Sequence, residues 1–268
     1  MKRVLTIAGS DSSGGAGIQA DLKTMTCLGV YGMSAVTALT AQNTTGVVGV
    51  VEAPPAFVAQ QIDCIFSDIR PDAVKIGMVS SGDIIRVIAA KLREYQAGHI
   101  VVDPVMVATS GSALIQDDAL SALQEDLFPL AEAITPNLPE GARLWGNPIR
   151  DQEEMCQAAA AIGAGLPGAV ILKGGHLSDT ADDLLWRRGE VCWYRADRVD
   201  NPNNHGSGCT LSSALASFLA LGYPLKEAFR KAKAYITACM EANLNLGQGR
   251  GPLWHNYAIP EGGSIPRV

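Results

Sequence analysis

Hydrophobic residues along this chain gather in short runs that are separated by longer stretches of mixed character. Six runs have the length and the β-branched content of strands: residues 4–8, 34–40, 73–77, 100–105, 133–135 and 169–173. Several are apolar at consecutive positions, which is typical of parallel strands buried on both faces. The pattern predicts a mostly parallel sheet with both faces covered.

The stretches between these runs have helical length and mostly helical spacing: residues 17–28, 56–66, 83–95, 117–127, 151–163, 209–221 and 225–243. This alternation of strands and helices predicts an α/β fold of three layers. Two late runs, 184–186 and 191–194, predict a hairpin added to the sheet. No repeat or linker divides the chain, so we predict one domain over 1–268, with an irregular tail from about residue 247.

Composition narrows the classes of function. The 268 residues are 47% hydrophobic and 18% charged, and the net charge is −6. No basic cluster is longer than Arg187-Arg188, which argues against a nucleic-acid partner. No run of about 18 apolar residues could span a membrane, and the first apolar run is too short for the core of a signal peptide. We therefore expect a cytoplasmic protein.

The cysteines and histidines show no metal or disulfide pattern. Six cysteines are spread along the chain without a Cys-x-x-Cys pair, which favours small core residues over a disulfide framework. The histidines, at positions 99, 176, 205 and 255, lack metal-ligand spacing, so we expect no zinc site. The sequence leaves the roles of His176 and His205 open.

The segment 204–214, with the sequence NHGSGCTLSSA, places glycines, a thiol and hydroxyls at the start of an apolar helix. Gly206 and Gly208 permit the crowded backbone in which successive N–H groups converge, and the helix dipole adds positive charge there. We therefore expect an anion hole that can hold a phosphate group. Cys209 lies at the helix start, a position that lowers the pKa of a thiol and can make it a base or a polar anchor.

Residues 15–20, GAGIQA, fit a dinucleotide-binding pattern that follows a strand. The acidic partner expected about 20 positions later is missing, because residues 35–42 contain no Asp or Glu. We therefore expect this loop to hold a small polar substrate, with Asp21 and Gln42 as hydrogen-bonding side chains. Asp21 could also be an exposed carboxylate in the first helical turn, and Gln42 a local strand-end amide.

Six motifs in order resemble those of ribokinase-like small-molecule kinases, in particular the hydroxymethylpyrimidine and phosphomethylpyrimidine kinases of thiamine synthesis. They are residues 6–23, 41–44, 75–78, 102–106, 135–140 and 173–176, and the 204–214 loop follows them. Cys209 replaces the catalytic acid of other ribokinase-like kinases, as it does in the pyrimidine kinases. Asn204 and Ser207 depart from the threonine more frequent in the family. The resemblance implies a ribokinase-like fold, ATP as co-substrate, Mg²⁺ and a homodimer.

The resemblance also implies roles for individual residues. Gln42 would read a pyrimidine edge, because an amide carries a donor and an acceptor side by side. Further substrate contacts are implied for Ala16, Asp21, Thr40, Met78 and Val105, with Met78 and Val105 as apolar walls unless Met78 is simply core. Nucleotide contacts are implied for Asn137, Ser207 and Thr210, and catalytic roles for Lys173, Gly206, Gly208 and Cys209.

Four polar residues near strand ends each fit two interpretations. Asn137 and Glu140 could form a helix capping box, or orient water around Mg²⁺ as the resemblance implies. Asp103 could help to position that metal or serve as a turn residue before Pro104. Lys173 ends an apolar strand, where a charge needs a partner, so it is either a structural ion pair or, by resemblance, a phosphate contact.

These expectations describe a kinase that transfers the γ-phosphoryl group of ATP to 4-amino-5-hydroxymethyl-2-methylpyrimidine and then to its monophosphate. The resemblance supplies the substrate, and residue chemistry supplies the reaction class, since phosphoryl transfer needs mainly positioning and charge neutralisation. Two alternatives stay open. A pyridoxal kinase would act on a similar flat ring with a hydroxymethyl arm, and a pyrimidine-binding sensor would keep the pocket without turnover.

Overall fold

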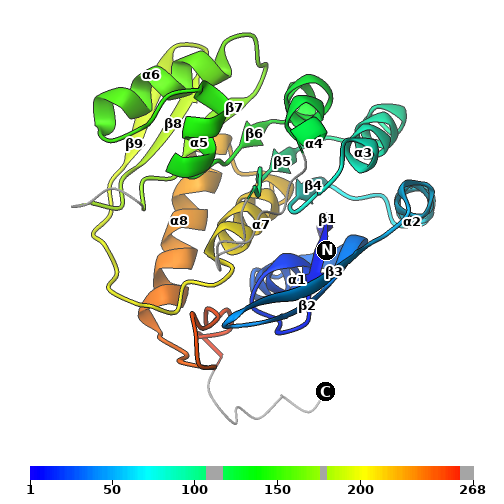
Figure 1. Ribbon diagram of the computed structural model, residues 1–268, viewed down its shortest axis with the longest axis horizontal. Coiled ribbons are helices and arrows are strands. Elements are labelled where there is room, and N and C mark those ends of the chain that lie inside the picture. Colours follow the sequence, from blue (N-terminus) through cyan, green and yellow to red (C-terminus); the bar gives the residue numbers. More distant parts are fainter. Residues whose placement is uncertain (107–116, 176–179, 260–268) are drawn as a thin grey trace.

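A computed structural model describes residues 1–106, 117–175 and 180–259, so His176 lies outside the described residues. Within these ranges nine strands form one sheet in the order β3-β2-β1-β4-β5-β6-β7-β8-β9 (Figure 1). Its parallel part consists of β1 (Arg3–Asp11), β2 (Tyr31–Asn43), β4 (Ala73–Ile76), β5 (Ile100–Val102), β6 (Ala133–Ile134) and β7 (Ala169–Leu172). At its edges β3 (Gly46–Glu52), β8 (Asp183–Arg187) and β9 (Glu190–Tyr194) each pair antiparallel with a neighbour.

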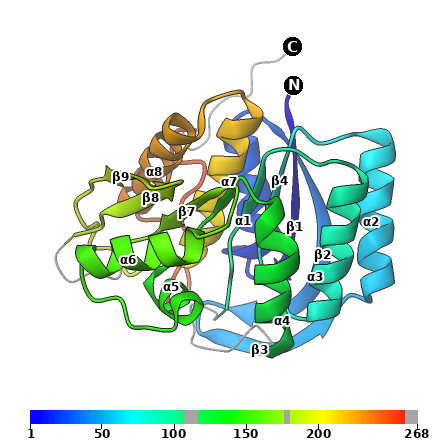
Figure 2. The same cartoon turned by 90° about the horizontal axis from the view of Figure 1, so that it is seen from above.

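Helices cover both faces of the sheet (Figure 2). One face carries α1 (Gly17–Cys27), α7 (Ser207–Ala220) and α8 (Leu225–Glu241). The other carries α2 (Pro55–Asp68), α3 (Gly82–Glu94), α4 (Asp117–Ala122), α5 (Leu138–Trp145) and α6 (Gln152–Gly163), with a π turn at Leu123–Leu127 and a 3-10 turn at Phe128–Leu130. The predicted three-layer α/β fold is confirmed.

Alternation along the strands sorts their side chains into two cores. In β1, Leu5 packs toward the α2–α6 layer, and its neighbour Val4 packs toward the layer of α1, α7 and α8. In β4, Val74 and Ile76 face the first of these layers, so Lys75 points with Ala73 into the second. The strand period therefore directs a lysine into the interior beneath α1 and α7.

The structure adds a strand that the sequence pattern did not predict. Strand β3 lies at the sheet edge, and Val48 and Val51 on it are 87% and 68% exposed. A strand with so little burial lacks the alternation by which strands are recognised. Strands β1 and β2 also extend past the predicted ends, to Asp11 and Asn43, where they reach the functional site.

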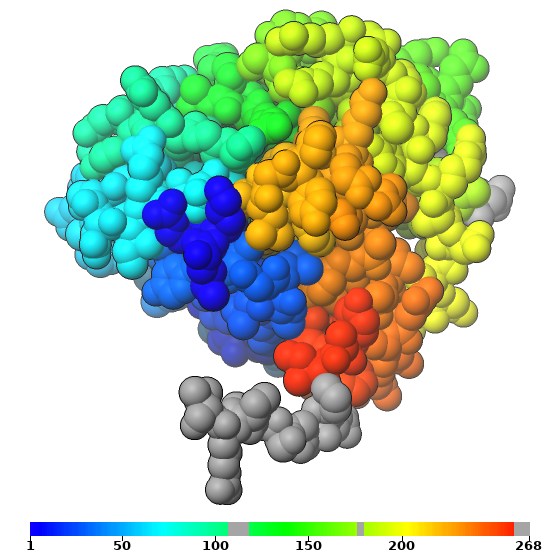
Figure 3. All heavy atoms as spheres, turned by 180° about the vertical axis from the view of Figure 1, so that it is seen from behind, coloured from blue at the N-terminus to red at the C-terminus, as the bar shows by residue number. Residues whose placement is uncertain are grey.

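The described end of the chain is irregular but well packed. Leu253 and His255 are buried, and the backbone carbonyl of Gly251 accepts a hydrogen bond from the N–H of His205. Figure 3 shows this segment in red, against the N-terminal region in blue and the helix in orange. Among the described residues, no helix combines the length and the apolar character that a membrane crossing requires.

Candidate active site

Polar side chains collect at one edge of the sheet, where the parallel strands end. Asp11 ends β1, Gln42 lies near the end of β2, and Asp103, Asn137 and Lys173 follow β5, β6 and β7. Because parallel strands end at the same edge, their carboxyl termini form the usual ligand site of an open α/β sheet. The N-terminus of α7 lies at this edge as well.

Close backbone contacts fix the start of α7. Gly206 has φ +83°, and a Cβ there would clash with the backbone carbonyl of Gly15. A Cβ on Gly208 would lie 3.1 Å from Oδ2 of Asp103 and 3.3 Å from Nζ of Lys173. The first turn of α7 therefore faces the ends of β5 and β7, with its backbone N–H groups beside a lysine, although the N–H of Ser207 already donates to the carbonyl oxygen of Asn204.

Asp103 and Lys173 form an ion pair at the centre of this edge. The Nζ atom of Lys173 lies 2.9 Å from Oδ1 of Asp103, which also accepts from the hydroxyl of Thr135 at 3.1 Å. Burial alone would raise the pKa of Asp103, but the charges of Lys173 and Lys75 hold it below its usual range. Lys173 thus has the ion-pair partner that its position requires, and it keeps 14% of its side chain exposed, enough to meet a ligand.

Asn137 and Glu140 form the predicted capping box at the start of α5. The Asn137 side chain accepts from the Glu140 N–H, and the Glu140 carboxylate accepts from the Asn137 N–H, both at 2.8 Å. Burial raises the pKa of Glu140 to about 7, with Lys173 opposing this shift and Asp103 adding to it. A nearby cation would favour the charged form of this carboxyl group and lower its pKa.

Asp103 and Glu140 fit a Mg²⁺ ion that takes most of its ligands from water and substrate phosphates. Asp103 and Glu140 supply hard carboxylate oxygens on either side of Lys173, and the charge of Asp103 raises the pKa of Glu140. Among the described residues no group of three or more His, Cys, Asp or Glu side chains could hold a metal by itself. Mg²⁺ commonly uses one or two carboxylates together with water and substrate phosphates, so the residues present fit this ion.

The structure excludes the exposed position considered for Asp21. Its carboxylate is fully buried and accepts hydrogen bonds from Lys75, Thr6 and Ser213 at 2.6 to 2.9 Å. A carboxylate so enclosed does not face solvent. Asp21 therefore supports the site from below, by joining β1, β4, α1 and α7.

Thr210 is enclosed in the same way. Its side chain is fully buried, its hydroxyl donates to the carbonyl oxygen of Gly206, and its Oγ1 lies 2.9 Å from Nε2 of His255. The hydroxyl is used inside the protein, where it stabilises the helix start. Ser207, one turn earlier, is only partly buried and stays a candidate for a nucleotide contact.

The expected lowering of the Cys209 pKa is also wrong. Burial raises the pKa of this thiol to about 11, and the charges of Asp21 and Asp103 add to the rise. Lys75 and a hydrogen bond from the N–H of Gly17 act in the opposite direction but do not outweigh burial. The helix start does not outweigh burial for this thiol, although Cys209 as a residue is only partly buried, and the raised pKa keeps the thiol protonated at neutral pH.

Gln42 and Thr40 lie together beside the loop that follows β1. The Gln42 amide is 3.2 Å from Oγ1 of Thr40 and 3.3 Å from Nε2 of His205, which lies 2.8 Å from Oδ2 of Asp11. Ala16 donates its N–H to the same Asp11 carboxylate at 2.8 Å. The structure thus brings Gln42, Thr40 and Ala16 to one place.

Two apolar residues lie at neighbouring strand ends, as expected. Met78 follows β4 and is 9% exposed, and Val105, which follows β5, is partly buried. Their positions are consistent with walls of a pocket at this edge.

Sequence reasoning gave no role to Asp11, Lys75 and His255. A lysine inside the apolar run 73–77 was a usable signal for Lys75, because a buried charge needs a partner. No local signal could pair Asp11 with His205, since 194 positions separate them.

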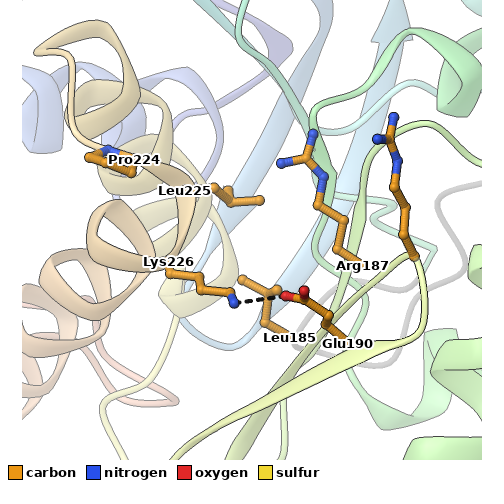
Figure 4. Close-up of a pocket in the computed structure, with 7 residues that line it drawn as sticks. Leu185, Arg187, Glu190, Pro224, Leu225 and Lys226 are labelled. Atoms are coloured by element: carbon orange, nitrogen blue, oxygen red, sulfur yellow. Dashed lines mark hydrogen bonds and ion pairs between the residues drawn. The ribbon is translucent and has the colours of Figure 1, made fainter.

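Away from this edge, the surface has a pocket of about 450 Å³ between the β8–β9 turn and the start of α8 (Figure 4). Its lining is Leu185, Arg187, Arg188, Glu190, Pro224, Leu225 and Lys226. None of the strand-end residues described above contributes to it, so we place the active site at the strand ends.

Residues 11–254 match a family model described as phosphomethylpyrimidine kinase. The chain belongs to the phosphomethylpyrimidine kinase family. A hydroxymethylpyrimidine/phosphomethylpyrimidine kinase of Rhizobium meliloti is 52% identical over 255 residues, which cover 94% of this chain and 96% of that protein. The thiamine biosynthesis bifunctional protein ThiED of Geobacter sulfurreducens is 53% identical over 96% of this chain, which spans 53% of that longer protein.

Solved structures place the fold in the same group. A phosphomethylpyrimidine kinase from Clostridium difficile is 46% identical with a TM-score of 0.80, covering 89% of this chain and 99% of its own. A pyridoxal kinase of Bacillus subtilis, solved with ADP, is 38% identical with a TM-score of 0.89, covering 96% and 98%. The ribokinase-like fold and the prediction of an ATP-dependent kinase of thiamine biosynthesis are thereby confirmed.

Proposed function

We propose that this phosphomethylpyrimidine kinase family member carries out both transfers, first to 4-amino-5-hydroxymethyl-2-methylpyrimidine and then to its monophosphate, at the strand-end site. The observation that carries the proposal is the first turn of α7 facing the Asp103–Lys173 pair. An anion hole beside a fixed ammonium group suits a phosphoryl group in transfer.

Lys173 and the backbone N–H groups of Gly206, Gly208 and Cys209 take the role of charge neutralisation, because the N–H of Ser207 already donates to the carbonyl oxygen of Asn204. Burial alone would lower the pKa of Lys173, but Asp103 and Glu140 raise it above its usual value, so its charge is permanent at working pH. The amides are held in place by the helix, so they need no rearrangement when charge develops on the phosphoryl oxygens. Positioning of this kind supplies most of the catalysis in phosphoryl transfer.

Asp103 and Glu140 are the residues that would hold Mg²⁺, largely through water. When bound, the ion would neutralise phosphate charge and align the phosphates of ATP. Ser207 and Asn137 are proposed nucleotide contacts, with Asn137 limited to its free amide nitrogen because its oxygen belongs to the capping box.

Gln42, Thr40, Ala16, Met78 and Val105 form the proposed acceptor side. The Gln42 amide would pair with the amino group and ring nitrogen of the pyrimidine, and the apolar side chains would cover its faces. Cys209 is the third residue of α7, and its thiol accepts a hydrogen bond from the N–H of Gly17 at the start of α1. We propose that the protonated thiol shapes the anion hole.

A coupled assay of ATP consumption tests the function. Purified protein with Mg²⁺ is given the pyrimidine alcohol, its monophosphate, pyridoxine or pyridoxal, and mass spectrometry counts the phosphates on each product. We expect both pyrimidines to be phosphorylated, and Lys173→Met to lose activity by about 10²-fold or more. Lys226→Gln, an exposed lysine on α8, serves as the control. If none of these acceptors leads to consumption of ATP, the result would support a pyrimidine-binding sensor instead.

A pyridoxal kinase is the second candidate, favoured by the full-length likeness to the Bacillus subtilis pyridoxal kinase. Both acceptors carry a hydroxymethyl arm on a flat ring, so a single pocket can accept both. The ratio of kcat/KM for the pyrimidine alcohol and pyridoxal distinguishes the two activities. A ratio below one would reverse our assignment.

We further propose that the enzyme is a cytoplasmic homodimer formed through the β2–β3 edge. Leu39 pairs with Val51 in the register of these strands, and Leu39, Val48, Val51 and Phe57 are all more than half exposed. An exposed apolar edge strand favours pairing with another chain. Val48→Lys with Val51→Glu should give a monomer in light scattering, and a wild-type monomer would contradict the proposal. The six free cysteines suit a reducing compartment.

A further inference from the structure

The peptide groups on both sides of Lys173 are held by hydrogen bonds to different parts of the chain. The N–H of Lys173 donates to the carbonyl oxygen of Pro136 at 2.9 Å. The next N–H, that of Gly174, donates to Oδ1 of Asp183 at 2.8 Å. A Cβ on Gly174 would clash with the carbonyl oxygen of Asp182, so the backbone at Gly174 lies directly against the residues that begin β8. The first bond belongs to the backbone, whereas the second depends on one side chain and can be removed by substitution.

Asp183 lies on the same face of the sheet as Lys173. Strands β7 and β8 pair antiparallel, with Leu172 opposite Leu184. The same register places Lys173 opposite Asp183, and side chains opposite each other in an antiparallel pair share a face. Burial raises the pKa of Asp183, whereas the positive charge of Lys173 lowers it, so this carboxylate feels the lysine charge. Lys173 therefore has two carboxylates on its side of the sheet, Asp103 and Asp183.

Lys233 of α8 occupies the other oxygen of the Asp183 carboxylate. Its Nζ atom lies 2.6 Å from Oδ2 of Asp183 and donates to the carbonyl oxygen of Ala181 at 2.7 Å. Both side chains of the ion pair are largely buried. The carboxylate is thus bound at both oxygens and its charge is balanced within the protein. This arrangement leaves the Lys173 ammonium to Asp103, which it meets at 2.9 Å.

We propose that Asp183 is a positioning residue, which fixes the backbone of Lys173 through the N–H of Gly174, with Lys233 as the counter-charge of its carboxylate. The inference rests on the proposed function, in which the Lys173 ammonium neutralises the phosphoryl group. A lysine side chain is long and flexible, so its ammonium is placed accurately only when the backbone that carries it is held. Asp183 acts through Lys173 and takes no part in the transfer itself.

The test compares two double variants that differ at one residue. Lys233→Met with Asp183→Asn, the Asn variant, keeps a side-chain oxygen that can accept from the Gly174 N–H. Lys233→Met with Asp183→Ala, the Ala variant, has no such oxygen. Neither leaves one member of the ion pair buried without its partner. We expect kcat for both transfers to be about tenfold lower in the Ala variant, because a small displacement of a charge-stabilising group slows the reaction strongly. KM for the pyrimidine alcohol should be equal in the two.

Substitution of Lys173 shows whether Asp183 acts through it. When Lys173→Met is added to both variants, the tenfold difference in kcat should disappear, because the ammonium group that Asp183 positions is absent. A purely structural role predicts equal kcat for the two variants and a difference only in melting temperature. Equal kcat, or a difference that persists without Lys173, would overturn the proposal.

Asp182→Ala is the matched control. It removes the neighbouring buried carboxylate, which accepts from Arg195 at 2.7 Å and from the Ala196 N–H at 3.1 Å. Its side chain does not bond to the Gly174 N–H, so we expect a lower melting temperature with unchanged kcat.

The affinity for ATP provides a measurement that needs no turnover. Calorimetric dissociation constants for ATP with Mg²⁺ should be about three- to fivefold weaker for the Ala variant than for the Asn variant, since Lys173 is placed to meet the phosphates. The two constants should become equal when Lys173→Met is added. A wild type that phosphorylates no acceptor would refute the proposed function, and the ATP affinities would then decide on Asp183. Equal affinities of the Asn and Ala variants would in that case overturn its positioning role.

Discussion

The Nζ atom of Lys75 lies 2.8 Å from Oδ2 of Asp21, and neither side chain exposes any surface. The pair joins Lys75, in the middle of the sheet, to α1, the helix that follows the loop at the end of β1. Hydrogen bonds from Thr6 and Ser213 to the same carboxylate extend the link to β1 and α7. The floor of the site is therefore a buried ion pair on which the active-site elements converge.

Breaking this pair should be costly. We expect Lys75→Met to lower the free energy of unfolding by about 3–5 kcal/mol, because it leaves the Asp21 carboxylate buried without its counter-charge. The double variant Lys75→Met with Asp21→Asn should recover part of that loss. Denaturant unfolding of the three proteins measures both effects. A loss of under about 1 kcal/mol in the single variant would contradict the argument.

Cys209→Ala should slow both phosphoryl transfers together and by less than about tenfold, since the backbone amides do most of the stabilising. The reason is the thiol pKa of about 11, which leaves about one molecule in ten thousand as thiolate at pH 7. Single-turnover rates with the alcohol and with the monophosphate, each supplied separately, give the two steps. If Cys209 instead acted as a base for the neutral alcohol, the substitution would slow the first transfer by about 10²–10⁴-fold and the second much less.

Gln42→Leu should reduce kcat/KM for the pyrimidine alcohol, and the reduction should correspond to a loss of about 2–4 kcal/mol in transition-state stabilisation. The affinity for ATP should stay unchanged. The substitution removes the donor and the acceptor that the ring edge requires. Gln157→Leu, an exposed glutamine on α6, is a matched control. An unchanged efficiency toward the pyrimidine would remove Gln42 from the site.

Buried His255 should make the protein less stable in acid. Burial, together with the charge of Lys23, lowers the pKa of His255 to about 4, whereas the unfolded value is near 6.5. The unfolded chain therefore binds the proton more readily, so this stabilisation is complete above about pH 6.5 and is lost as the pH falls toward 4.

His255→Gln isolates this effect, because its amide can still donate to Oγ1 of Thr210. Between pH 7.5 and 4.5 the wild type should lose about 2–3 kcal/mol more unfolding free energy than the variant. Glu140 titrates in the same range in both proteins and cancels in the difference. Parallel pH profiles for the two proteins would show that His255 does not carry the acid sensitivity.

Much of the architecture is determined by the sequence itself. Buried parallel strands leave continuous apolar runs such as 169–172, and helices leave a 3.6-residue period, because each element must bury its own surface. Asp103 directly follows the apolar residues 100–102, and Gly206 and Gly208 lie at the start of an apolar helix, so a strand end and a helix start could be predicted for them. The capping box of Asn137 and Glu140 was likewise readable from a spacing of three residues.

Only the tertiary structure decided which partners these polar groups have and how far each is buried. Asp21 pairs with Lys75, 54 positions away, and Asp11 with His205, 194 positions away, so no local pattern could assign them. The pKa of Cys209 depends on how completely the folded chain removes water from the thiol, and that desolvation outweighs the local effect of the helix start. Spacing along the chain determines the elements, whereas burial and long-range pairing, which exist only after folding, determine the chemistry of each group.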